Sequence, residues 1–306
     1  MSTFNSCDKR VVTDRIRVVL FLILFLVSGN NITFAQTVEA KPVLVTCRWL
    51  ENNISEPDLV VLHISTIARN YENGHIPGSR FLWPGWINIS IETESTVPAG
   101  IKEIRKVMAG LGICNSSHVI LCGTEGNLVV VSRIFVTLSH FGLGGRISIL
   151  QGGFDEWKAS GMEVTSERPE LEKGKLELEE QGIIVDGEWM IRNLNNKEYC
   201  IIDARSKASY DGNPDISRQG HIPGAKNMPV FALYDNKTWH FVSEEVIKEL
   251  FNKLDIPDGA RPVFYCGTGN SACIGYVAAV IAGYKPVVYD GSMEEWSSRL
   301  DLPMEK

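Results

Sequence analysis

Short apolar runs alternate with helix-like stretches along most of the chain. The apolar runs cover residues 59–64, 119–122 and 147–150, and then 200–203, 263–266 and 287–290. Runs of this kind are typical of strands that are buried on both faces of a parallel sheet. Residues 243–254 open with a serine and two glutamates and then space apolar residues as an amphipathic helix does. The pattern predicts an α/β fold in which each half of the chain is a parallel sheet with helices on both faces.

Sequence motifs recur in the same order in the two halves, at a nearly constant offset. The matching pairs are Trp49 and Trp189, His75-Ile76-Pro77-Gly78 and His221-Ile222-Pro223-Gly224, Cys122-Gly123-Thr124 and Cys266-Gly267-Thr268, and Trp157 and Trp296. This repetition indicates a duplication, in which Cys122 is expected to be equivalent to Cys266. We place domain 1 at 41–165 and domain 2 at 183–304. Residues 166–182, rich in Glu and Lys, are expected to form an exposed linker that few contacts cross.

The first 35 residues read as an export signal. Basic residues precede an apolar stretch at 18–27, and Thr33-Phe34-Ala35 then provides a cleavage site. A retained membrane anchor is the alternative, but a span needs about 20 apolar residues, and this stretch is much shorter. We therefore expect cleavage of 1–35, no stable membrane span afterwards, and an exported protein that is periplasmic or secreted.

Charge and cysteine content narrow the classes of ligand. The net charge of -7 gives no bulk attraction to nucleic acid or anionic membranes, so an anionic substrate must be held by a local site. The six cysteines after residue 35 are too sparse for a disulfide scaffold. Their spacing matches neither a zinc site nor a Cys-x-x-Cys redox motif. We expect mostly free thiols with at most one bridge, no metal and no cofactor.

Cys266 is the strongest candidate for chemistry. It ends an apolar run and is followed by Gly267-Thr268-Gly269-Asn270-Ser271, after which Ala272 opens a buried helix. Glycines in such a loop let several backbone N–H groups turn inward, and the helix N-terminus adds partial positive charge. That cradle favours a thiolate or the terminal sulfur of a persulfide. A buried structural thiol is the alternative reading.

Together these motifs resemble a known family. His-Ile-Pro-Gly before an apolar segment, a cysteine loop after a strand, and the closing Asp290-Gly291-Ser292-Met293-Glu294-Glu295-Trp296 resemble the rhodanese superfamily. Two copies in tandem are similar to thiosulfate and 3-mercaptopyruvate sulfurtransferases. The resemblance implies that Cys266, in domain 2 only, takes sulfane sulfur from a small anionic donor. It also implies transfer to cyanide or to a thiol acceptor, such as a thioredoxin-like protein.

The resemblance also suggests roles for individual residues. The loop is similar to the Cys-Gly-Ser-Gly-Val-Thr-Ala of mercaptopyruvate-preferring members, with Thr268 in place of a serine and Asn270 in place of a valine. Arg205 matches an arginine that grips the anionic end of the donor, and Arg218 is a weaker candidate for a second. His75 matches a histidine that assists proton handling, although it equally fits a role in ordering the Pro77-Gly78 turn.

Domain 1 is expected to be noncatalytic. Its loop reads as the Cys266 loop with Glu125 inserted, which sets a carboxylate near any anion, and Leu128 stands where Ser271 provides a hydroxyl. Two other functions share parts of this pattern. A noncatalytic carrier of sulfane sulfur would use the same Cys266 loop. A cysteine phosphatase needs an arginine six positions after the cysteine, where Ala272 and Leu128 stand instead.

Overall fold

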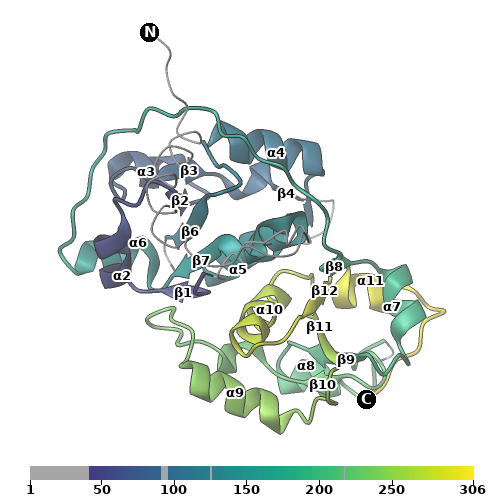
Figure 1. Cartoon of the computed structure of the whole chain (residues 1–306). Coiled ribbons are helices and arrows are strands. Elements are labelled where there is room, and N and C mark those ends of the chain that lie inside the picture. Colours follow the sequence, from purple (N-terminus) through teal and green to yellow (C-terminus); the bar gives the residue numbers. More distant parts are fainter. Residues whose placement is uncertain (1–40, 91–95, 125, 217) are drawn as a thin grey trace, which may run out of the picture.

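The computed structural model describes residues 41–90, 96–124, 126–216 and 218–306. The predicted signal peptide therefore lies outside the described residues. Figure 1 shows two α/β domains that lie against each other, with β1 to α6 in the first and β8 to α11 in the second. Each contains one five-stranded sheet, and all strand pairs within these two sheets are parallel, as the apolar runs predicted.

Domain 1 has the strand order β1-β7-β6-β2-β3. The strands are β1 (Leu44–Val45), β2 (Leu59–Ile64), β3 (Arg80–Leu82), β6 (His118–Gly123) and β7 (Ile147–Leu150). The helices are α2 (Cys47–Asn53), α3 (Ala68–Asn73), α4 (Ile101–Gly110), α5 (Leu128–Leu138) and α6 (Gly153–Ala159). Helices α4 and α5 contribute side chains to the apolar cluster on one face of the sheet, and α2 and α6 to the cluster on the other.

Domain 2 repeats this order as β8-β12-β11-β9-β10. Its strands are β8 (Ile184–Val185), β9 (Tyr199–Asp203), β10 (Lys226–Asn227), β11 (Arg261–Tyr265) and β12 (Val287–Tyr289). Its helices are α7 (Gly187–Asn193), α8 (Lys207–Asp211), α9 (Glu244–Lys253), α10 (Ala272–Ile281) and α11 (Ser292–Ser298). The hydroxyl of Ser243 caps α9, as the sequence pattern predicted. Helices α9 and α10 pack on one face, and α7 and α11 on the other.

Smaller elements connect these parts. An antiparallel hairpin, β4 (Asn88–Ser90) with β5 (Thr96–Pro98), extends from domain 1. Short helical turns lie at η3 (Pro84–Trp86), η4 (Ser139–Leu143), η5 (Gly144–Arg146) and η6 (Val230–Ala232). The hairpin reaches domain 2, because Oγ1 of Thr96 lies 2.8 Å from Oδ1 of Asn270.

The two domains share one apolar core. Helices α5 and α10 face each other between the sheets, and their side chains belong to a single buried cluster that includes residues of both domains (Figure 1). The rings of Phe135 and Tyr276 meet across this interface with centroids 6.4 Å apart. Among the described residues, Leu128–Arg146 is the one stretch long and apolar enough to cross a bilayer, and 67% of its most apolar window is buried inside the protein. Its burial is that of a core segment.

The linker packs more closely than its composition predicted. It runs as a long coil around domain 1 in Figure 1, and no helix or strand lies between α6 and β8. However, Leu176 and Leu178 are buried in the shared core, and the amide of Gly174 donates to the carbonyl of Ala109 at 2.8 Å. The expectation of a linker with few contacts was wrong, because two leucines among the charged residues anchor it to domain 1.

His63 gives domain 1 a predicted sensitivity to acid. The ring is fully buried between Tyr71 and Phe154, and neither ring nitrogen has a hydrogen-bond partner among the described residues. Burial, with a smaller effect of His75, lowers its pKa from 6.5 to about 4. The unfolded chain therefore binds a proton at a higher pH than the folded chain does. The stabilisation from a neutral His63 is complete above pH 6.5 and is lost as the pH falls towards 4.

We expect His63→Phe to reduce this loss. Between pH 7.5 and pH 5 the wild-type free energy of unfolding should fall by about 2 kcal/mol more than that of the variant, following the linkage relation. Urea unfolding of both proteins at the two pH values measures the difference. His118, whose pKa burial also lowers to about 4, remains in both proteins and serves as the internal reference. Equal pH dependence of the two proteins would contradict the prediction.

Candidate active site

Cys266 is the first residue after β11, and the loop that follows it leads into α10. The residue is buried, with 1% of its surface exposed. Its amide donates to Oγ of Ser292 at 3.0 Å, and its carbonyl accepts from the amide of Met293 at 3.0 Å. The next carbonyl, that of Gly267, accepts from the amide of Glu294 at 2.9 Å. The beginning of α11 therefore fixes the backbone on both sides of the sulfur-bearing carbon.

The loop after Cys266 has unused hydrogen-bond donors. In the described part of the chain, no acceptor is found for the backbone N–H groups of Gly267, Thr268, Gly269 and Ser271. Gly269 has a φ of +84°, and a Cβ at this position would lie 2.3 Å from the carbonyl oxygen of Asp290. Only glycine fits there. Free N–H groups ahead of a helix are the feature that an anion-binding cradle requires.

The remaining loop residues join the cradle to its surroundings. Asn270 accepts the hydrogen bond from Thr96 of domain 1, which gives this polar residue an interdomain role. Ala272 is fully buried as the first residue of α10. The thiol of the next residue, Cys273, donates to the carbonyl of Gly269 at 3.5 Å. Both ends of the loop are therefore anchored, one by α11 and the other by α10 and domain 1.

Ser292 is a site residue that the sequence reasoning did not single out. It is fully buried with a φ of +49°, which is uncommon outside glycine. Its hydroxyl accepts from the amide of Cys266 and donates to the carbonyl of Tyr289 at 3.0 Å. A signal was present in the repeat, because Gly153 stands at the equivalent place in domain 1 with a φ of +58°. A glycine in one copy marks a backbone conformation that the other copy also adopts.

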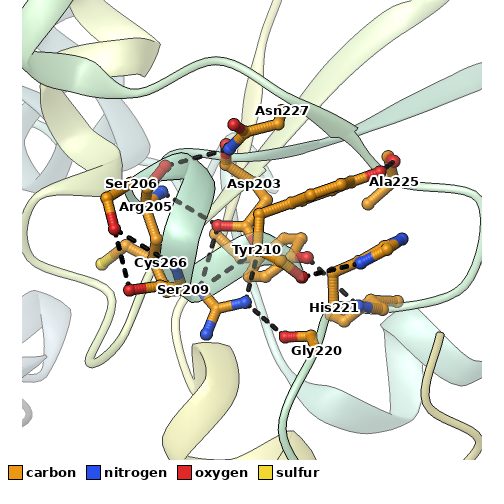
Figure 2. A network of polar contacts seen from close by, with 12 residues as sticks. Asp203, Arg205, Ser206, Ser209, Tyr210, Gly220, His221, Ala225, Asn227 and Cys266 are labelled. Carbon is orange, nitrogen blue, oxygen red and sulfur yellow. Dashed lines mark hydrogen bonds and ion pairs between the residues drawn. The ribbon is translucent and has the colours of Figure 1, made fainter. Parts of the chain in front are cut away.

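Arg205 emerges from the neighbouring strand. Asp203 on β9 pairs with Tyr265 on β11, so the residues that follow the two strands leave the same edge of the sheet. Nη2 of Arg205 lies 2.6 Å from Oδ2 of Asp203, whose side chain is fully buried, and 2.7 Å from the carbonyl of Gly220. Figure 2 shows this arrangement with Cys266 in the same view. The guanidinium also interacts with Tyr265, the last residue of β11.

A pocket of about 360 Å³ lies beside this arginine. Its walls include Arg205, Ser209, Arg218 and Met293. The amide of Met293 is bonded to the carbonyl of Cys266, so the pocket adjoins the residue that carries the candidate nucleophile. Cys266 itself is not among the lining residues. The pocket therefore places an arginine guanidinium close to the backbone that carries Cys266.

The geometry agrees with the comparison to known families. The profile of the Rhodanese-like domain matches the chain twice, at residues 46–160 and 186–299. The chain belongs to the rhodanese family. It is 30% identical to the thiosulfate sulfurtransferase of Mus musculus, over 84% of this chain and 92% of the relative. It is 28% identical to the 3-mercaptopyruvate sulfurtransferase of Escherichia coli K12, over 84% and 95% of the two chains.

Other relatives extend this picture. The sulfur carrier protein TtuD of Thermus thermophilus is 28% identical over 86% of this chain and 96% of its own length. The anaerobic ergothioneine biosynthesis enzyme from Chlorobium limicola, solved with trimethyl histidine, superposes with a TM-score of 0.72 at 23% identity, covering 86% of this chain and 70% of its own. YnjE gives a TM-score of 0.71 at 23% identity, with coverages of 86% and 68%. The structural matches show the tandem rhodanese fold.

In this rhodanese, His75 has the same surroundings as its counterpart in domain 2. Its Nδ1 lies 2.7 Å from the carbonyl of Tyr71, and its ring stacks on Tyr71 with centroids 3.7 Å apart. His221 stacks on Tyr210 at the same centroid distance and lies 2.9 Å from its carbonyl. The other nitrogen of His75 contacts the carbonyl of Glu167 at 3.1 Å. These contacts support the reading in which His75 orders a turn.

Arg218 is also held by the backbone of its own domain. Its guanidinium donates to the carbonyls of four residues at the C-terminal end of α11 and beyond it, namely Trp296, Ser297, Arg299 and Leu302. Cations at this end of a helix satisfy carbonyls that have no partner within the helix. Arg218 lines the pocket, but these contacts occupy its Nε, Nη1 and Nη2 groups. Its role as a second donor-binding arginine stays a prediction. Its observed contacts anchor the end of α11 and the residues that follow this helix.

The strand register shows that Cys122 is not the counterpart of Cys266. The pairs that fix the register are Ser148 with Ile120 in domain 1 and Val287 with Val263 in domain 2. Ser148 and Val287 stand at the same distance before the tryptophan of their repeats, so Ile120 and Val263 correspond. Two residues further along these strands, Cys122 on β6 therefore corresponds to Tyr265 on β11. Gly123 takes the place of Cys266, and the expected equivalence of the two cysteines was wrong.

Two further observations support this register. Cys122 and Tyr265 both lie in the smaller apolar cluster of their own domain, whereas Cys266 belongs to the cluster shared between the domains. Gly126 and Gly269 both have positive φ, and two residues separate each of them from the position of Cys266 or its counterpart. Glu125 is therefore no insertion. The identical Cys-Gly-Thr letters of the two repeats are displaced by one residue relative to the strands.

Cys122 has the properties of a structural thiol. It is fully buried, and burial raises its pKa, as do the nearby Cys47 and Asp155 to a smaller extent. Cys47 is also buried, and burial together with Glu156 raises its pKa to about 11. Five cysteines are free thiols, as predicted for most of them: Cys47, Cys122, Cys200, Cys266 and Cys273. Neither Cys47 nor Cys122 has the surroundings that activate a nucleophile.

A tryptophan of domain 2 covers Gly126, the domain 1 counterpart of Gly269 in the Cys266 loop. A Cβ on Gly126 would lie 2.0 Å from Cε2 of Trp239, which shows that the indole rests on this glycine. The next residue, His240, contacts the carboxylate of Glu156 on α6. Where domain 2 has the loop of Cys266, domain 1 has a glycine covered by a tryptophan of the other domain.

Proposed function

We propose that this rhodanese transfers sulfane sulfur from 3-mercaptopyruvate or thiosulfate to a thiol or to cyanide through a persulfide on Cys266. The observation that carries the proposal is the Cys266 loop with its free N–H groups, which leaves the same edge of the sheet as Arg205. Domain 1 has no equivalent nucleophile, because Gly123 stands in that place. The curated relatives support a sulfurtransferase, and donor and acceptor are our inference.

The reaction has two steps. The Cys266 thiolate attacks the sulfane sulfur of the donor, an S–S bond forms, and the donor's bond to that sulfur breaks. The leaving group takes the electron pair and departs as sulfite, or as the enolate of pyruvate, which then takes a proton. An acceptor thiolate or cyanide next attacks the outer sulfur and returns the Cys266 thiolate. Backbone N–H groups of the loop stabilise the charge on sulfur in both steps.

Steady-state transfer to cyanide and to a small thiol, measured with each donor, tests the proposal. The similarity of the loop to mercaptopyruvate-preferring relatives leads us to expect the higher kcat/KM with 3-mercaptopyruvate. A carrier is the second candidate, supported by the similarity to the sulfur carrier protein of Thermus thermophilus. A carrier would take up one sulfur for each protein, visible by mass spectrometry, and would release it only to a partner protein. Absence of turnover with both donors would sink the enzymatic proposal.

Arg205 is our candidate for the residue that holds the anionic end of the donor. Asp203 orients its guanidinium through Nε and Nη2, and the residue lines the pocket. We expect Arg205→Lys to raise the KM of both donors by roughly 10- to 100-fold, because lysine lacks the planar fork that binds carboxylate and sulfonate. The matched control is Lys207→Met, which removes an exposed cation from the adjacent helix and should leave KM unchanged. An unchanged KM in Arg205→Lys would contradict this role.

We also propose that the protein acts after export, with residues 1–35 removed. The basic residues, the short apolar stretch and the small residue at Ala35 support this. The acceptor would then be a thiol of that compartment, such as a thioredoxin-like protein. Sequencing the N-terminus of the protein purified from its native host should give Gln36 as the first residue, and an intact Met1 would contradict export by cleavage.

A further inference from the structure

Arg133 is a buried charge in domain 1 that the mechanism above does not use. It is the only charged residue of α5, and 4% of its side chain is exposed. Its Nη1 lies 2.5 Å from Oδ1 of Asp290, and its Nη2 lies 3.2 Å from Oδ2. A guanidinium in an apolar helix is costly unless it is paired, and the partner here belongs to the other domain.

Asp290 is in contact with the loop of Cys266. Its carbonyl oxygen lies where a Cβ on Gly269 would be, so the two backbones touch. Two residues further on, Ser292 accepts the hydrogen bond from the amide of Cys266. A shift of Asp290 would therefore move both the end of the cradle and the contact that fixes the nucleophile.

Arg133 reaches the same loop by two other routes. Its Nη2 donates to the carbonyl of Thr96 at 2.5 Å, and the hydroxyl of Thr96 is bonded to Asn270 at 2.8 Å. Its guanidinium also interacts with the thiol of Cys273, where the positive charge opposes the rise in pKa to about 12 that burial causes. That thiol is bonded to the carbonyl of Gly269. Three contacts from one guanidinium thus converge on the loop.

The pair is present only on the side of the interface that carries the nucleophile. By the strand register, the counterpart of Arg133 on α10 is Tyr276, and the counterpart of Asp290 is Gln151. Tyr276 and Gln151 therefore form no ion pair at the corresponding place beside the domain 1 loop. A salt bridge that served only to join two similar domains would not need this asymmetry, because α5 and α10 already pack through their apolar side chains.

We propose that Arg133 is a positioning residue for the sulfur-transfer loop, through which the noncatalytic domain holds the Cys266 cradle in its reactive geometry. This inference rests on the proposed function. The residue does not touch the donor. It acts through Asp290, Thr96 and Cys273 on a loop whose N–H groups must face the sulfur, and small displacements of such groups are costly for the rate.

Steady-state kinetics of four variants test the proposal. We expect Arg133→Met to lower kcat by roughly 10- to 100-fold, while the KM of the donor stays within about twofold, because Arg205 and its pocket belong to domain 2. Arg133→Lys should recover part of the loss. Asp290→Asn, which keeps the shape of the partner, should lower kcat similarly, and the double variant Arg133→Met/Asp290→Asn should be no slower than the slower single variant. The same kcat as wild type in Arg133→Met would overturn the proposal.

Arg80→Met is the matched control. Arg80 is another partly buried arginine of domain 1, but it donates to the carbonyl of Leu111, away from the cradle. The Arg80→Met substitution should lower the free energy of unfolding and leave kcat unchanged. If Arg80→Met and Arg133→Met lower kcat equally, the effect is general loosening of domain 1, and the positioning role is refuted.

Hydrogen exchange separates this inference from the proposed function. The amides of Cys266, Met293 and Glu294 are bonded within the site, so their exchange reports on its order without any substrate. We expect these amides to exchange at least tenfold faster in Arg133→Met than in wild type and to be unaffected in Arg80→Met. A wild-type protein that turns over no donor would sink the proposed function alone. Unchanged exchange in Arg133→Met would sink the positioning role even in an active enzyme.

Discussion

Cys266→Ser is expected to abolish sulfur transfer, with a loss in kcat of about three orders of magnitude or more, because a serine hydroxyl cannot form a persulfide. The substitution changes one atom. It leaves intact the bond from the backbone amide to Ser292 and the cradle beyond it. The fold should therefore survive, and circular dichroism together with urea unfolding would show it. Turnover with each donor, and the absence of a sulfur adduct by mass spectrometry, provide the measurement.

Cys122→Ser is the matched control for this prediction. Cys122 faces the apolar cluster of domain 1 and corresponds to Tyr265, so its hydroxyl replacement should keep kcat within about twofold of wild type. The same change should lower the free energy of unfolding by about 1–3 kcal/mol, since it buries a hydroxyl among apolar side chains. Loss of turnover in a folded Cys122→Ser, with Cys266→Ser still active, would reverse the assignment of the two domains.

Gly269→Ala should be the most damaging change that leaves all reactive groups in place. The position has a φ of +84°, and the added methyl group would meet the carbonyl of Asp290 at 2.3 Å. Because both obstacles are backbone, neither a rotamer change nor a side-chain shift relieves them. We expect a loss of about 2–4 kcal/mol in the free energy of unfolding and a fall in kcat of roughly 100-fold as the cradle opens. Urea unfolding and donor kinetics measure the two effects.

Gly267→Ala provides the comparison within the same loop. Its φ is not in the positive region, and a Cβ there would meet nothing within 4 Å. Its free energy of unfolding should therefore stay within about 1 kcal/mol of wild type. If both alanine variants unfold at the same urea concentration as wild type, the loop is not held against Asp290 as the structure shows it.

The sequence predicted the parts of this protein that depend on local patterns. Apolar runs such as 263–266 gave the buried strands, and the Cys266 loop with its two glycines gave the candidate nucleophile and its cradle. Arg205 was found by resemblance, and the structure places it on the neighbouring strand end. These features lie within a few residues of a strong local signal, which is why one sequence sufficed to find them.

The features that the sequence did not reveal depend on three-dimensional register and on contacts between domains. Identical letters around Cys122 and Cys266 suggested equivalence, but side chains alternate between faces along a strand, and a displacement of one residue moves a thiol to the opposite face. Arg133 gave no local signal beyond being one charge in an apolar helix. Its partner, Asp290, is far along the chain, and the packing of the two domains brings them together.

The position of Trp239 has a consequence for how the molecule unfolds. Each domain has a side chain that packs on or binds to the other domain. The indole of Trp239 rests on Gly126 of domain 1, and Arg133 of domain 1 forms an ion pair with Asp290 of domain 2. Leu176, in the connection between them, belongs to the same continuous core as α10. Separation of the two halves would expose apolar surface on both and leave a charge on each without its partner. We therefore expect the two repeats to unfold together as one cooperative unit.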